Sequence, residues 1–283
     1  MAKSRGPDHS SFLAYKNYRW LKISLFLCVL SMIGYWSTDF DPVRNGGTWY
    51  GYTLGTIGAL LILWLALLGI RKRAITQGNW SLKAWTSAHI YLGLGLLIIA
   101  TLHTGFQFGW NIHTLAYALM VFVIGSGLFG IYFYVSVPRK MSTNRAEMGQ
   151  QQMLDDIAAL DALLIDTAQP LRNDYIPVVE KAAEQSRLGG SIFRRLSGVD
   201  RRCATQKALN FFKAELRTTE NEMRSPVLDA ISVLERKNAL LGRIRKHIRF
   251  KALLQIWLCI HIPFTFALIA ALIVHIISVF YYS

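Results

Sequence analysis

The sequence predicts an all-α membrane protein with five transmembrane helices, on the strength of three observations. Of its 283 residues, 53% are hydrophobic and only 17% are charged, a balance that is unusual for a soluble domain. No acidic residue occurs between Asp41 and Glu147 or after Glu235. Lys and Arg cluster at the ends of hydrophobic runs, where they set membrane orientation, so we do not expect nucleic acid as a partner.

Five segments approach the length of about 20 apolar residues that a spanning helix needs. They are residues 20–38, 50–70, 85–110, 114–136 and 252–281. The first follows a basic leader, which is also typical of a signal peptide. It lacks a convincing small-x-small cleavage site, however, so we expect a retained helix.

The basic residues of the connections predict the orientation. The N-terminus, the loop at 71–83 and the segment that starts at residue 138 are basic. The connections at 37–48 and 111–113 hold only Arg44 as a fixed positive charge. We therefore expect a cytoplasmic N-terminus and a periplasmic C-terminus in a bacterial inner membrane, with the third and fifth helices running in the same direction.

A polar stretch separates the fourth span from the fifth. Helical periodicity runs through three of its segments, residues 148–168, 175–187 and 203–223. No helix breaker lies between Pro226 and the fifth span, so this last stretch can continue into the membrane as one helix. We expect three parts: a membrane part with helices 1–4 at 1–137, a cytoplasmic helical insertion at 138–250, and the fifth transmembrane helix at 251–283.

Four of the seven histidines lie inside spans, and they form two pairs with the same interval. His89 and His103 are 14 residues apart on the third helix, and His261 and His275 are 14 residues apart on the fifth. Fourteen residues are close to four helical turns, so both members of a pair face the same way, about 21 Å apart along the axis. Because the two helices run parallel, we expect His89 opposite His261 and His103 opposite His275.

Two imidazoles that face each other across an acid-free bundle suit the axial ligation of haem iron, because a neutral imidazole brings no charge into lipid. For any single histidine, the alternative is a polar contact between helices. The three cysteines form no CxxCH motif, which excludes the usual covalent attachment of haem. We therefore expect two haem b groups. Their iron ligands would be His89 with His261 and His103 with His275.

A flat macrocycle between helices also needs small residues on the neighbouring helices. Gly55 and Gly69 on the second helix, and Ala116 and Gly130 on the fourth, repeat the 14-residue interval at matching depths. Glycine is also frequent in spanning helices for packing alone. The cations nearest to the expected haem propionates are Arg44 and His113 outside, and Arg71, Arg73, Lys83, Arg139 and Lys140 on the cytoplasmic side.

The segments SAHIYLGLG to LHTGFQFGWNIHTLAY and LCIHIPFTFALIAALIVHIISVF resemble membrane b-type cytochromes. The second to fifth spans look like the di-haem four-helix core of the cytochrome b family. This resemblance implies an electron-transfer subunit of a larger membrane oxidoreductase complex, surrounded by lipid. It also implies exchange with quinone and with a separate iron–sulfur, flavin or cytochrome redox subunit. The acidic Pro-Glu-Trp-Tyr-type loop of cytochrome bc quinol oxidation is missing, so that particular site is not expected.

Other classes of protein share parts of this pattern. Ferric-reductase-like and NADPH-oxidase-like membrane domains place similar histidine intervals on their third and fifth helices, which implies a transmembrane electron conduit of another family. A His-lined metal transporter is a further alternative, although no Asp or Glu accompanies the histidines in the spans. The last is a membrane scaffold whose insertion recruits partners and whose histidines only pack.

Overall fold

The computed structural model confirms an all-α fold, because every regular element among the residues that it describes is helical. It describes residues 12–38, 46–73, 81–136, 143–185, 196, 203–219 and 221–281. Five of the described helices are long and apolar enough to cross a membrane, as predicted. The chain is thus a multi-pass membrane protein.

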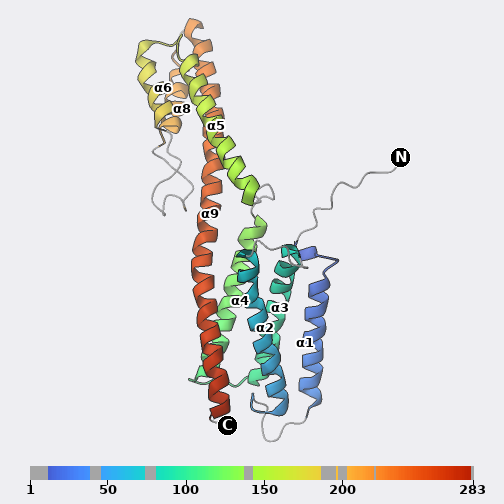
Figure 1. Ribbon diagram of the computed structural model, residues 1–283. Helices are drawn as coiled ribbons and strands as arrows, with labels where there is room; N and C mark the ends of the chain where they lie inside the picture. Colours follow the sequence, from blue (N-terminus) through green and yellow to red (C-terminus); the bar gives the residue numbers. More distant parts are fainter. Residues whose placement is uncertain are drawn as a thin grey trace, which may run out of the picture. The chain divides into compact units, whose positions relative to one another are not determined.

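The helices follow the predicted order along the chain (Figure 1). The apolar ones are α1 (Arg19–Ser37), α2 (Trp49–Arg73), α3 (Leu82–Thr104), α4 (Ile112–Ser136) and the end of α9 (Asn221–Tyr281). The polar ones are α5 (Thr143–Thr167), α6 (Ile176–Glu184) and α8 (Ala204–Glu215). Two short 3-10 turns, η1 (Phe12–Ala14) and η2 (Asn173–Tyr175), precede α1 and α6.

The third span is shorter than expected, because α3 ends at Thr104 and not near Trp110. Its last turn is closed by Gly105, which has a left-handed backbone (φ 57°) and donates its N–H to the carbonyl of Leu102. Phe106 also has positive φ, so the helix cannot continue. At the other end, the Ser81 side chain accepts a hydrogen bond from the backbone N–H of Ala84 and caps the first turn.

The chain divides into two compact units. Unit 1 comprises Met1–Gly130 and Cys259–Ser283, and unit 2 comprises Ile131–Leu258. The helix α9 contributes to both, because it runs without a break from Asn221 to Tyr281. The stretch after Pro226 and the fifth span therefore form one helix.

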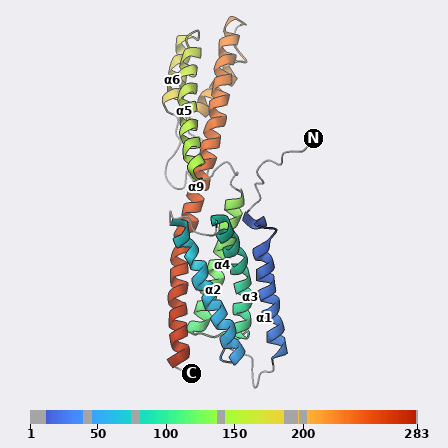
Figure 2. The same cartoon turned by 45° about the vertical axis from the view of Figure 1, so that its right-hand side comes forward.

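In unit 1, α3 packs against α1 and α2 (Figure 2). The contact with α1 is made by small residues: the Ser24 hydroxyl donates to the carbonyl of Tyr91 (2.7 Å), and Cys28 lies against Gly95. A Cβ at Gly95 would lie 2.4 Å from the Ser24 oxygen, so only glycine permits this approach. Small residues at the contact are the usual means by which spanning helices pack closely.

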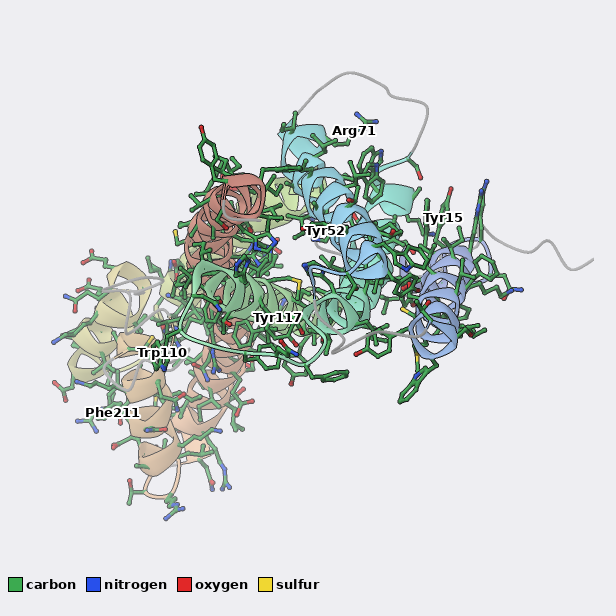
Figure 3. The ribbon with its side chains drawn as sticks, turned by 90° about the horizontal axis from the view of Figure 1, so that it is seen from below. Tyr15, Tyr52, Arg71, Trp110, Tyr117 and Phe211 are labelled. Atoms are coloured by element: carbon green, nitrogen blue, oxygen red, sulfur yellow. The ribbon has the colours of Figure 1, made fainter. Side chains whose placement is uncertain are left out.

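The remaining helices of unit 1 join this group through side chains. The end-on view of Figure 3 shows α1 at one side of the helices and α9 at the other. The Tyr117 hydroxyl of α4 lies 2.9 Å from the Thr101 hydroxyl of α3. A buried apolar cluster joins α2, α3, α4 and α9, and its members are Leu65, Ala88, Leu92, Leu96, Met120 and Leu268.

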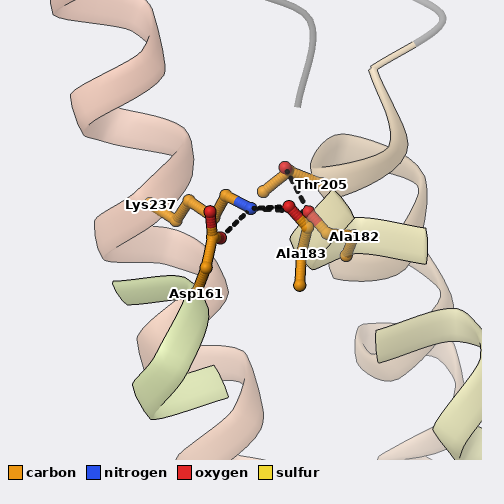
Figure 4. Close-up of polar contacts among 5 residues, drawn as sticks. All are labelled: Asp161, Ala182, Ala183, Thr205 and Lys237. Carbon is orange, nitrogen blue, oxygen red and sulfur yellow. Dashed lines mark hydrogen bonds and ion pairs between the residues drawn. The ribbon is translucent and has the colours of Figure 1, made fainter. Parts of the chain in front are cut away.

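Unit 2 has a core of its own, formed by α5, α6, α8 and the first part of α9. Its most deeply buried members include Leu164, Val179, Phe212 and Leu234. The Lys237 side chain of α9 is also fully buried. Figure 4 shows its ammonium group between Asp161 of α5 and two carbonyls at the end of α6.

Candidate functional site

The four histidines of the spans lie within unit 1, on α3 and α9. The rings of His103 and His275 have their centroids 6.0 Å apart and their planes 86° to each other. His89 lies within electrostatic range of His261. The structure therefore brings the rings of His103 and His275 together, as the equal intervals and parallel helices predict.

The apolar cluster of unit 1 separates the two histidine pairs along the helices. Leu96 of α3 is seven residues from both His89 and His103, and Leu268 of α9 is seven residues from both His261 and His275. Both leucines are buried, with exposed fractions of 2% and 4%. The pairs thus form two sites at different depths with an apolar layer between them.

The histidines of α3 are held by backbone carbonyls of α2. Nδ1 of His103 lies 2.8 Å from the carbonyl oxygen of Gly51, and Nδ1 of His89 lies 3.1 Å from that of Leu65. The two acceptors are 14 residues apart, because antiparallel helices repeat the interval of one on the other. A carbonyl can only accept, so in a neutral imidazole Nδ1 carries the proton and Nε2 carries the lone pair.

The histidines of α9 are held by side chains of α4. Nδ1 of His261 lies 2.7 Å from the Ser126 hydroxyl, and Nδ1 of His275 contacts Nδ1 of His113. Ser126 donates its own proton to the carbonyl of Val123 (2.8 Å), so it accepts from His261. Nε2 therefore carries the lone pair in His261 as well.

Gly55 allows His103 to approach α2. A Cβ at Gly55 would lie 2.7 Å from Cε1 and 3.0 Å from Nδ1 of His103, which is too close without a shift of the ring. Gly69, its expected counterpart in the other site, differs, because a Cβ there would meet no atom within 4 Å. Of the two glycines that share the interval, only Gly55 touches an imidazole.

On α4, the residues beside the imidazoles differ from those that the interval suggests. Ala116 is half-buried and Gly130 is buried. It is Gly127 that lies against His261, because a Cβ there would be 3.7 Å from Cε1 of that ring. Ser126, the partner of His261, is not among the residues that the interval predicts. A usable signal existed, since His113 and Ser126 are 13 residues apart, close to the interval on α9.

The expected partners of haem propionates receive little support from the structure. Arg44 lies outside the described residues, as do Arg139 and Lys140. His113 is described, and it contacts the ring of His275. The roles of these cations as propionate partners stay predictions.

The donor atoms of the site are imidazole nitrogens in pairs. Among the residues that the structure describes, no group of three or more His, Cys, Asp or Glu side chains is arranged to hold a metal ion. Haem iron already has four ligands from its macrocycle, so it requires only two more from the protein. Paired imidazoles therefore fit haem iron better than a bare cation, which needs a larger set of ligands.

The chain was compared with known proteins in three ways. Family models, curated proteins and solved structures were each searched with this chain, and none gave a match.

Proposed function

We propose that this protein is a membrane b-type cytochrome subunit that carries electrons across the bilayer. Each of two haem b groups would be held by one histidine of α3 and one of α9, namely His103 with His275 and His89 with His261. One observation carries the proposal: the rings of His103 and His275 lie close together, and Nδ1 of each of the four histidines contacts a neighbouring group. Metal-ligating histidines are held in the same way by their second nitrogen.

The distance between the rings fits a shared iron atom. A metal–imidazole nitrogen bond is about 2 Å long, so two imidazoles on opposite sides of one metal have ring centres about 6 Å apart. The centroids of His103 and His275 are 6.0 Å apart. For His89 and His261, the support is the common interval and the contact that each Nδ1 makes.

The residues of the chain have separate tasks in this proposal. Carbonyls of α2 and side chains of α4 hold the four imidazoles in one orientation with Nε2 available as ligand. The apolar residues around them exclude water, and a low-dielectric surrounding is one of the factors that set a redox potential. When bound, haem supplies one-electron chemistry. The two sites are displaced by about 21 Å along each helix, which spreads them across the membrane.

The partners of the subunit belong to the proposal too. Lipid would surround the apolar side chains that unit 1 exposes, such as Phe26, Leu60 and Phe266. Quinone would exchange electrons at one of the membrane interfaces. A separate iron–sulfur, flavin or cytochrome subunit would complete a larger complex and exchange electrons with the haems.

The test is the absorption spectrum of the purified protein, with haem content determined per chain. We expect reduced-minus-oxidised bands of b type and two haems per polypeptide. His103→Ala or His275→Ala should remove one haem and leave the other, because the second pair keeps both ligands.

A matched control is available in His247→Ala, which changes a histidine of unit 2 and should retain both haems. A wild-type protein without b-type bands would contradict the proposal. So would full haem content in both the His103→Ala and the His275→Ala variants, since neither residue would then be a ligand.

A further inference from the structure

His113 stands out among the groups that hold the imidazoles. It is exposed at the beginning of α4, and its ring centroid lies 4.5 Å from that of His275. Its Nδ1 meets Nδ1 of His275. Two of the other histidines have a backbone carbonyl at this position, and His261 has the hydroxyl of Ser126. His275 alone has a second imidazole.

The direction of this hydrogen bond follows from the ligand role proposed for His275. If Nε2 of His275 binds iron, its Nδ1 carries the proton and donates it to Nδ1 of His113. His113 then accepts with the lone pair of Nδ1 and carries its own proton on Nε2. Both rings are satisfied by this assignment of protons.

We infer that His113 is the positioning residue of the haem site of His103 and His275, which we call the outer site. It orients His275 and strengthens it as a ligand of ferric iron. The inference rests on the proposed function. An imidazole nitrogen is a more basic acceptor than a hydroxyl oxygen, so it draws the proton of His275 more strongly and leaves more electron density on the ligating nitrogen. A stronger donor stabilises the ferric state, which lowers the midpoint potential of the outer haem.

The inner site provides the internal comparison. There, Ser126 accepts from His261 while donating to Val123, so a single hydroxyl oxygen takes the place of the imidazole. The two α9 ligands therefore differ in the strength of their acceptors, an imidazole nitrogen for His275 and a hydroxyl oxygen for His261. This difference lowers the midpoint potential of the haem held by His275 relative to that of the haem held by His261.

The experiment is a redox titration of the haem-loaded, full-length protein, followed by absorbance and by electron paramagnetic resonance. In His113→Phe, the acceptor is lost and the ring is replaced by one of similar size. We expect one haem to move to a higher midpoint potential with a changed ferric signal, while the other stays as in the wild type. His113→Gln restores an acceptor oxygen and should return the potential part of the way.

Ser126→Ala serves as the matched variant and should shift only the haem that His113→Phe leaves unchanged. Unchanged potentials and ferric signals in His113→Phe, with two haems present, would overturn the inference and leave the proposed function standing. Loss of one haem in both His113→Phe and His113→Gln would also overturn it, because His113 would then be a ligand itself. A wild-type protein without haem would contradict the inference together with the proposed function.

Discussion

At the scale of single residues, Gly55 determines whether His103 can reach the carbonyl of Gly51. In Gly55→Ala, the new methyl group would push the ring away, because a Cβ would lie 2.7 Å from Cε1 of His103. The hydrogen bond to Gly51 is worth about 1 kcal/mol. Alanine also has a higher helix propensity than glycine, which stabilises the helix by about the same amount. We therefore expect little change in the thermal unfolding midpoint but the loss or weakening of one haem, measured as haem content per chain.

Gly69→Ala is the control for this prediction, since a Cβ there has no neighbour within 4 Å. It carries the same gain in helix propensity and should keep both haems. Equal haem content in the two variants would show that Gly55 does not position His103.

Residue by residue, the sequence predicts which histidines come together better than it predicts the groups that hold them. Equal intervals on parallel helices identify the pair His103 and His275, because an interval near four turns places side chains on one face. The acceptors on α2 are backbone carbonyls, which every residue has, so no side chain marks Gly51 or Leu65. Ser126 is not marked by the interval either. The interval points to Gly and Ala, whereas the contact with His261 requires a hydroxyl.

At the scale of helices, the spans were predictable and one end was not. The segment after Thr104 is rich in aromatic residues and glycine, so hydropathy alone extends the third span to Trp110. The end depends instead on local backbone conformation, because Gly105 and Phe106 both have positive φ. The continuous α9 was predictable from the absence of helix breakers. The contact that joins it to the rest of unit 2 was not.

This contact is made by the fully buried Lys237, which joins three helices. Its ammonium group pairs with Asp161 of α5 and donates to the carbonyls of Ala182 (2.5 Å) and Ala183 (3.4 Å) in the last turn of α6. A cation at the C-terminal end of a helix also meets the negative end of its dipole. In the sequence, Lys237 resembles the basic residues around it.

Replacing Lys237 with methionine keeps an unbranched side chain, shorter by one atom, and removes its charge. We expect a destabilisation of about 3 kcal/mol, because Asp161 and the α6 carbonyls lose their partner in a buried place. The measurement is hydrogen exchange of the α6 and α8 peptides in the purified full-length protein, which should become faster. Lys213→Met is the control, since that lysine forms an exposed pair with Glu235.

The effect should depend on pH with a definite sign. Burial raises the pKa of the Asp161 carboxyl above its ordinary value of 3.8, against the opposing effect of Lys237. A raised pKa means that the folded state binds a proton more readily than the unfolded chain, so stability rises as pH falls through this range. Lys237→Met should therefore regain part of its protection at acidic pH, and a deficit that grows on acidification would contradict this account.

At the scale of the whole molecule, acidic residues mark the division between the two units. Of the 17 Asp and Glu residues, 14 lie in residues 138–250, and the spans contain none. Unit 2 can therefore fold around a core with a mixed charged surface. In the described apolar helices of unit 1, the histidines supply uncharged nitrogen atoms that could bind a metal. Because the spans contain no acidic residue, the Lys and Arg residues at their ends remain as the signal for orientation.

The charges of the connections predict how the molecule is oriented in the membrane. The connection between α2 and α3 is flanked by Arg71 and Lys83, whereas residues 105–111 between α3 and α4 contain no charged residue. Basic connections stay in the cytoplasm, so residues 105–111 should lie outside and the polar helices inside. Single cysteines at the exposed positions of Gln107 and Gln152 would test this in full-length protein with Cys28, Cys203 and Cys259 replaced by serine. A membrane-impermeant maleimide should label Gln107→Cys in intact cells and Gln152→Cys only after the membrane is opened. The reverse pattern would invert the molecule and would place the site of His103, His275 and His113 at the cytoplasmic face.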